Sequence, residues 1–217
     1  MNDVGQAISS GFKFVSQVGE ECEALANVLK QELDDLFVHG PLKDMYRLEN
    51  WSSSYNTKGW IYSDMAWSLP LVPKRRGKPK VAAHLSFQIS LLCSDPEAGS
   101  SPEPLLHINF WEPSVSFRND EFMGFPMTSL SCELQPRLRD GTARLLRWDA
   151  DDHDGWWTYT LRLAEVRSLE DVRKLISVPV GQLLGNTTAG EAMLETLSAV
   201  VCYKAVDDQP DYYRVIF

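Results

Sequence analysis

Residues 81–93 read VAAHLSFQISLLC, and this stretch decides the fold. From Val81 to Leu91, small or polar side chains occupy every second position between the apolar ones. A period of two is that of a β-strand, in which successive side chains point to opposite faces of the sheet. The stretch therefore predicts a strand with one buried face. The apolar positions are Val81, Ala83, Leu85, Phe87, Ile89, Leu91 and Cys93, and the positions between them include Ala82, His84, Ser86, Gln88 and Ser90.

The segments on either side extend this strand into an antiparallel meander. Residues 60–72 form an extended stretch, residues 105–112 alternate again, and residues 143–148 and 156–166 read as a second hairpin. Clusters of Gly, Pro, Asp and Ser separate these segments and are typical of turns. We therefore predict an antiparallel sheet of about five to seven strands, lying within residues 58–166.

A long helix is predicted at the start of the chain, over residues 1–38. Apolar residues recur there in steps of three and four until Gly40, which favours the end of a helix. A straight helix of this length measures roughly 50 Å, whereas a compact chain of this size has a radius of gyration of about 17 Å. The helix is therefore expected either to break near Gly19, which weakens a helix interior, or to protrude from the domain.

The apolar stripe of this helix has two interpretations. It packs against the sheet, or part of it is offered to another helix as a coiled coil or dimer seam. Under the second interpretation, the expected partners are another protein or a second copy of the chain. The candidate partner-binding residues are spaced seven apart: Ile8, Val15, Cys22, Leu29 and Leu36.

Two helices are predicted near the end of the chain, over residues 168–204. Ser168 and Asp171 have the spacing of a helix amino-terminal cap, and Thr188 opens the second helical pattern. A final run over residues 211–217 could add an edge strand. Together these segments predict one α+β domain in which terminal helices cover one face of the sheet.

Composition limits the functional classes. The 217 residues carry a net charge of −9, which repels a phosphate backbone and makes nucleic acid an unexpected partner. The four cysteines are far apart and show no C-x-x-C pair, as expected for reduced thiols. The start of the chain does not resemble a signal peptide, and no apolar run is long enough to span a membrane. The expected location is the cytoplasm.

No catalytic or metal-site motif is present, so no catalytic residue, resident metal or cofactor is predicted.

A basic loop lies between the first two predicted strands. A cluster opposed to the overall charge of a protein can bind an anion, an acidic partner or nucleic acid. Charged residues at a hairpin tip can equally serve to prevent edge-to-edge pairing of sheets. The candidate anion-binding residues are Lys74, Arg75, Arg76, Lys78 and Lys80.

Two tryptophans are expected on the second face of the sheet. Trp156 and Trp157 are consecutive in a predicted strand and must face opposite sides, and Trp111 is out of phase with its apolar neighbours. The second face is therefore expected to be covered by a helix, a partner or an apolar ligand. Trp111 and Trp156 are the candidate ligand-binding residues.

The acidic loop Asp149–Asp154 could supply oxygen ligands to calcium or magnesium, although its spacing departs from that of a calcium-binding loop. It is interpreted either as a solvated hairpin tip or as the site of a metal-dependent hydrolase.

The leading functional hypothesis is instead a non-catalytic interaction protein, such as an adaptor, a chaperone-like protein or an immunity component. A protein that binds an apolar small molecule or lipid in a Trp-lined cavity is the other alternative.

Overall fold

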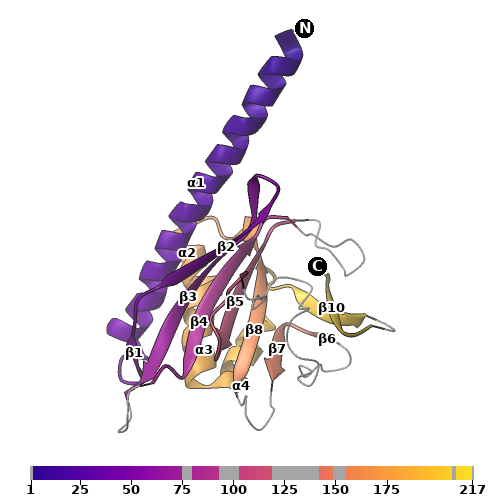
Figure 1. The fold of residues 1–217 in the computed structure, drawn as a ribbon. Coiled ribbons are helices and arrows are strands. Elements are labelled where there is room, and N and C mark those ends of the chain that lie inside the picture. The colour runs from indigo at the N-terminus through magenta and orange to yellow at the C-terminus, as the bar shows by residue number, and fades with distance from the viewer. Residues whose placement is uncertain are drawn as a thin grey trace.

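The fold is centred on a large antiparallel sheet (Figure 1). The computed structural model describes residues 2–74, 80–92, 103–118, 142–148, 155–206 and 209–216. Seven strands of these ranges form the sheet, in the order β1-β3-β4-β5-β8-β7, with β2 also paired to β3. They are β1 (Tyr46–Leu48), β2 (Ser52–Lys58), β3 (Ile61–Pro73), β4 (Ala83–Ser90), β5 (Leu105–Trp111), β7 (Leu145–Trp148) and β8 (Trp156–Arg162).

A second, three-stranded sheet and a set of helices complete the described fold. The small sheet has the order β10-β9-β6 and contains β6 (Thr142–Ala143), β9 (Cys202–Val206) and β10 (Gln209–Ile216). The helical segments are α1 (Asn2–Val38), η1 (Leu163–Glu165), α2 (Leu169–Val172), the π-helical turn η2 (Arg173–Ser177), α3 (Val178–Gly185) and α4 (Thr187–Leu194). This arrangement confirms the predicted α+β class and the antiparallel sheet.

The core lies on the side of the sheet to which the apolar residues of the predicted strand 81–93 point. β3 and β4 pair antiparallel, with Trp67 opposite Phe87, and the two rings stack at 5.1 Å between centroids. Phe87 is fully buried in a cluster that also contains Leu29 and Leu33 from α1 and Ile176 from η2. The helices at the two ends of the chain therefore cover one face of the sheet, as predicted (Figure 1).

α1 is one continuous helix, so the predicted alternative of a break near Gly19 is wrong and the alternative of a protruding helix is correct. Gly11 and Gly19 each lie in open space, and helical backbone accommodates them at a cost of about 1 kcal/mol each. The helix ends as predicted before Gly40, where a Cβ atom would meet the Cα of Leu36 at 2.7 Å. Its amino-terminal end stands well away from the sheet (Figure 1).

The carboxyl-terminal prediction needs correction. Ser168 does cap α2, accepting a hydrogen bond from the backbone N–H of Asp171. However, α4 ends at Leu194, and residues 202–204 belong to β9 rather than to a helix. The reason lies in tertiary packing. Val200 forms an antiparallel bridge with Leu161 of β8, so the chain at this point is extended rather than helical. β10 lies at the edge of the small sheet and pairs with β9.

The opposite face of the large sheet is also buried. The two tryptophans predicted a covered second face, whereas the alternation of residues 81–93 predicted only one buried face. Ser86 and Gln88 are 2% and 0% exposed, although they occupy the polar phase of β4. A second apolar cluster lies on this face and joins the large sheet to the small one. It contains Ala66, Leu105, Trp111, Val115, Leu146, Trp156, Val201 and Tyr203.

Candidate interaction surface

Among the described residues, the amino-terminal half of α1 has a clear excess of exposed apolar groups. We call residues 4–17 the free half and residues 18–37 the covered half. Four apolar side chains of the free half are more than half exposed: Val4, Ile8, Phe12 and Phe14. Figure 1 shows this half extending beyond the sheet. Large apolar groups concentrated on one exposed element are typical of an interaction site rather than of ordinary surface.

The hairpin between β2 and β3 adds aromatic rings to this surface. Gly59 adopts a positive φ of 69° at its tip and permits the tight turn. Trp60, 69% exposed, stacks on Phe12 at 5.0 Å between ring centroids. Tyr62 is also exposed and packs against Tyr55 at 5.1 Å. The stack between Phe12 and Trp60 thus steadies the free half, and the apolar surface of the free half continues onto the hairpin.

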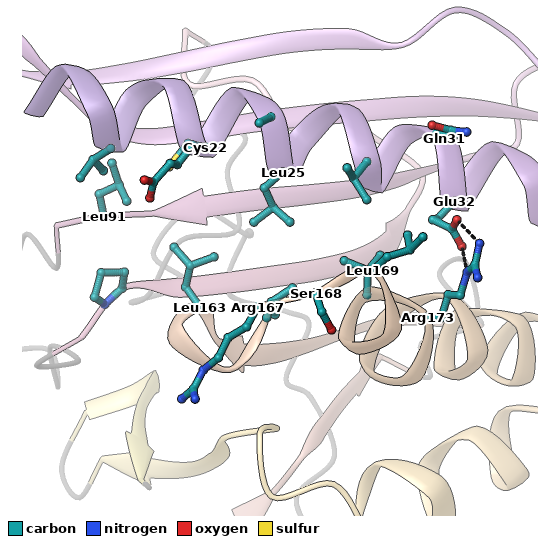
Figure 2. Close-up of a pocket in the computed structure, with 17 residues that line it drawn as sticks. Cys22, Leu25, Gln31, Glu32, Leu91, Leu163, Arg167, Ser168, Leu169 and Arg173 are labelled. Carbon is teal, nitrogen blue, oxygen red and sulfur yellow. Dashed lines mark hydrogen bonds and ion pairs between the residues drawn. The ribbon is translucent and has the colours of Figure 1, made fainter.

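A groove of about 670 Å³ lies on another side of α1 (Figure 2). One wall belongs to the covered half and the other to residues 163–173, with Leu91 and Pro104 between the two. Figure 2 shows Leu25 and Leu163 pointing into it from opposite walls. Its apolar lining comprises Val18, Cys22, Ala24, Leu25, Val28, Leu91, Pro104, Leu163, Val166, Leu169 and Val172.

The groove lining also contains polar side chains: Glu21, Gln31, Glu32, Arg167, Ser168 and Arg173. Arg173 donates two hydrogen bonds of 2.9 Å to the carboxylate of Glu32, which fixes α1 to the second wall at one end (Figure 2). Cys22 is buried, and burial, with smaller contributions from Glu21 and Glu23, raises the pKa of its thiol. A raised pKa reduces the thiolate population and makes this cysteine a poor nucleophile.

The structure divides the five predicted partner-binding residues. Ile8 and Val15 are exposed on the free half. Cys22 and Leu29 are 5% and 0% exposed within the core, and Leu36 packs against the same core. The last three lie on the side of the helix that the sheet covers, and their partner-binding role stays a prediction.

The predicted anion-binding loop is described only at its two ends. Lys74 and Lys80 are both exposed, and the ammonium group of Lys74 donates a hydrogen bond to the carbonyl of Lys43. Arg75, Arg76 and Lys78 lie outside the described residues. Anion binding by this loop therefore stays a prediction.

Trp111 and Trp156 stack on each other, with 6.1 Å between ring centroids and 7° between ring planes. Both are buried, 5% and 9% exposed, in the second apolar cluster. Their ligand-binding role stays a prediction, but the structure shows that both rings pack within a cluster of the chain's own side chains. The groove in Figure 2 has no tryptophan in its lining and differs from the predicted Trp-lined cavity.

A buried polar row crosses this second face. In register across four strands lie Ser68, Ser86, Asn109 and Thr158, all 2% exposed or less. The hydroxyl of Ser86 donates to that of Ser68 at 2.8 Å, and the hydroxyl of Thr158 donates to Asn109 Oδ1 at 2.6 Å. These bonds satisfy the hydroxyl groups and Asn109 Oδ1, whereas the buried Nδ2 of Asn109 has no partner among the described residues.

His107 lies in the neighbouring row, with Nδ1 2.7 Å from the hydroxyl of Thr160. The hydroxyl of Tyr203 also bonds to Thr160, so this chain of groups connects the large sheet to β9. Burial lowers the pKa of His107 to about 3 and raises that of Tyr203. A histidine with such a low pKa is a weak base at neutral pH, and the observed contacts fit a structural role.

The predicted metal loop, Asp149–Asp154, lies outside the described residues. Across the described ranges, no group of three or more His, Cys, Asp or Glu side chains is arranged to hold a metal ion. The same ranges contain no helix with the length and apolarity needed to cross a bilayer.

Sequence reasoning missed the second wall of the groove and the aromatic hairpin tip. The segment around η1 follows a clear strand and has no long periodicity of its own, so only tertiary packing reveals its position beside α1. Comparison with protein-family models, with curated proteins and with solved structures finds no match to this chain.

Proposed function

We propose that this protein is a non-catalytic interaction module, such as an adaptor, that associates with a second copy of itself through the free half of α1. The observation that carries the proposal is the continuation of one apolar stripe beyond the sheet. Cys22 and Leu29 bury the stripe in the core, whereas Val15 and Ile8 leave it 39% and 57% exposed on the same face.

The charge of the free half supports a protein partner rather than a membrane. Helices that lie on anionic bilayers carry many Lys and Arg residues on their polar face. Residues 4–17 contain a single charged side chain, Lys13, and otherwise present Gln and Ser opposite the apolar face. A surface of this composition favours burial against another apolar protein surface.

Preorganisation also supports the proposal. The stack between Phe12 and Trp60 holds the free half beside the β2–β3 hairpin, and the helix is already formed throughout. Association then requires little ordering of the chain, which reduces its entropic cost. Cys22 and Cys202 are free thiols, in keeping with a reducing compartment, and we propose the cytoplasm as the location.

Sedimentation velocity over a range of protein concentrations tests this function. We expect a monomer–dimer equilibrium in the unmodified protein and at least a tenfold weaker association for Ile8→Glu. The matched control is Ser9→Glu, because Ser9 is exposed on the polar side of the same helix. A protein that stays monomeric up to millimolar concentration, or equal effects of the two substitutions, would contradict the proposal.

A further inference from the structure

The groove shown in Figure 2 lies on the helix that we propose to be the interaction element. Resting on that proposed function, we infer that the free half of α1 from one copy occupies the groove of the other copy, antiparallel to its covered half, and that the exchange is reciprocal. The partner is thus a second copy of this chain, and both parts of the contact come from described residues.

A second helical seam on α1 supports this arrangement. From Val4 to Glu32 its positions alternate in steps of three and four without interruption, the spacing of a helix that packs along another helix. This seam is distinct from the sheet-facing stripe that contains Leu29 and Leu33. Its members are Val4, Ala7, Gly11, Phe14, Val18, Glu21, Leu25, Val28 and Glu32.

The two ends of the seam differ in what they contact. In the covered half, Val18, Leu25 and Val28 line the groove and are only partly buried. In the free half, Phe14 is 67% exposed. Antiparallel packing would bring the exposed end of the seam in one copy against the groove-lining end in the other, with Phe14 beside Leu25.

The apolar arc of the free half is wide enough for a groove with two walls. Ala7, Gly11 and Phe14 form one edge of the arc, and Ile8 and Val15 lie farther round the helix. A single stripe suffices for two helices that pack side by side, whereas a helix in a groove contacts both walls. The first edge would meet α1 of the partner copy, and the second would meet its residues 163–172.

The lengths of the two parts agree. The groove is lined along α1 from Val18 to Glu32, a rise of about 21 Å at 1.5 Å per residue. The free half, residues 4–17, measures about 20 Å by the same rule. With Phe14 beside Leu25 it runs antiparallel to residues 22–35, so residues 7–17 lie within the groove and residues 4–6 extend past the Glu32 end. Gly11 has no atom within 4 Å of a Cβ position in the single chain, so its small size leaves space that a neighbouring helix can fill.

The buried area favours reciprocal exchange. A helix about 20 Å long and 11 Å wide buries on the order of 350 Å² when half of its surface is covered. One helix in one groove, counted on both partners, would bury only about 700 Å², below the size of stable interfaces. Two such contacts bury about 1,400 Å², within the usual range, and a two-fold axis closes the assembly at two copies.

Disulfide trapping tests the position of the helix. Phe14→Cys protein is mixed with Leu25→Cys protein, oxidised, and the linked peptides are identified by mass spectrometry. A disulfide forms only where Cα atoms approach within about 7 Å, so we expect a covalent dimer with a bond between positions 14 and 25. Ser16→Cys, on the polar side of the free half, mixed with Leu25→Cys is the matched control and should give no such bond.

Disulfide trapping and sedimentation together distinguish a failure of groove docking from a failure of self-association. A dimer in sedimentation that yields disulfides only between two copies of position 14, or none, overturns groove docking and leaves self-association standing. A monomer at all concentrations contradicts the proposed function itself.

A substitution in the second wall provides an independent measurement. Leu169 is 46% exposed, so Leu169→Glu should leave folding intact and weaken dimerisation at least tenfold. The matched control is Val178→Glu, because Val178 is 48% exposed and lies outside the groove lining. Equal dimerisation of both variants would overturn the inference, as would saturable binding of a fluorescent fatty acid that Leu169→Glu abolishes without affecting dimerisation.

Discussion

The two halves of α1 share one helix and one apolar periodicity but differ in what lies against them. In the covered half, the sheet buries Leu29 and Leu33 completely. The free half extends past the end of the sheet (Figure 1). On the same face Ile8 and Val15 are exposed, and Phe12 stacks on Trp60 at the hairpin tip. A periodic pattern therefore predicts which face of a helix is apolar, whereas the extent of the neighbouring sheet decides how much of that face is buried.

The largest expected effect comes from removing equivalent side chains from the two halves. Leu29→Ala should lower the free energy of unfolding by about 2–5 kcal/mol, because it leaves a cavity in a packed core. Ile8→Ala should change the unfolding free energy of the monomer by no more than about 0.5 kcal/mol. Urea denaturation at low protein concentration measures both. Similar losses in the two variants would show that the halves do not differ as described.

Lowering the pH should reduce the stability of the sheet, in which His107 is buried, and should leave the free half of α1 unchanged. His107 is neutral in the native protein because burial lowers its pKa to about 3, whereas the unfolded chain has the ordinary value near 6.5. Stability is therefore fully present above about pH 6.5, and it falls by about 1.4 kcal/mol per pH unit as the unfolded chain takes up a proton.

The His107→Gln variant isolates this contribution. The difference in unfolding free energy between the unmodified protein and the variant, measured at about pH 7.5 and pH 5, should change by roughly 2 kcal/mol. An unchanged difference would mean that His107 is protonated equally in both states. Residues 4–17 contain only Lys13 as a titratable side chain, so the free half itself contributes no corresponding change.

The contrast between the two halves also shows how far sequence reasoning extends. The period of two at residues 81–93 and the helical period of α1 were sufficient for the α+β class, the β3–β4 hairpin and the helix-covered face. These features follow from local patterns whose physical meaning does not depend on distant residues. The groove could not be predicted, because its walls are far apart in the chain and meet only through tertiary packing.

The second face of the sheet was predicted only in part, for a related reason. The alternation in β4 predicted one buried face and the tryptophans predicted a covered second face, and Ser86, Gln88 and Ser90 are buried. One signal was present: none of these three residues carries a charge, whereas a strand face in water usually includes Lys or Glu. Small neutral polar residues in register can satisfy one another by hydrogen bonding, and this allows both faces to be covered.

Gly19→Ala, a helix-stabilising substitution at the junction of the two halves of α1, should have an intermediate effect on stability. Gly19 has open space at its Cβ position, so Gly19→Ala should raise stability by about 1 kcal/mol through reduced backbone freedom in the unfolded chain. Urea denaturation and the circular dichroism signal at the helical minimum measure the change. A loss of stability would indicate that the helix bends at Gly19, and α1 would then not carry its stripe straight into the free half.

The smallest expected effect concerns two lysines on α1. Lys30, in the covered half, lies with its ammonium nitrogen 5.4 Å from the centroid of the Trp67 ring. Lys30→Met keeps most of the apolar stem but removes the charge, and should lower the unfolding free energy by about 0.5–1 kcal/mol. Lys13→Met is the matched control in the free half, where no effect on unfolding is expected. Because the attraction is electrostatic, Lys30→Met should also shift Trp67 fluorescence. An unfolding free energy that is unchanged by Lys30→Met would show that the contact with the Trp67 ring does not help to hold the covered half on the sheet.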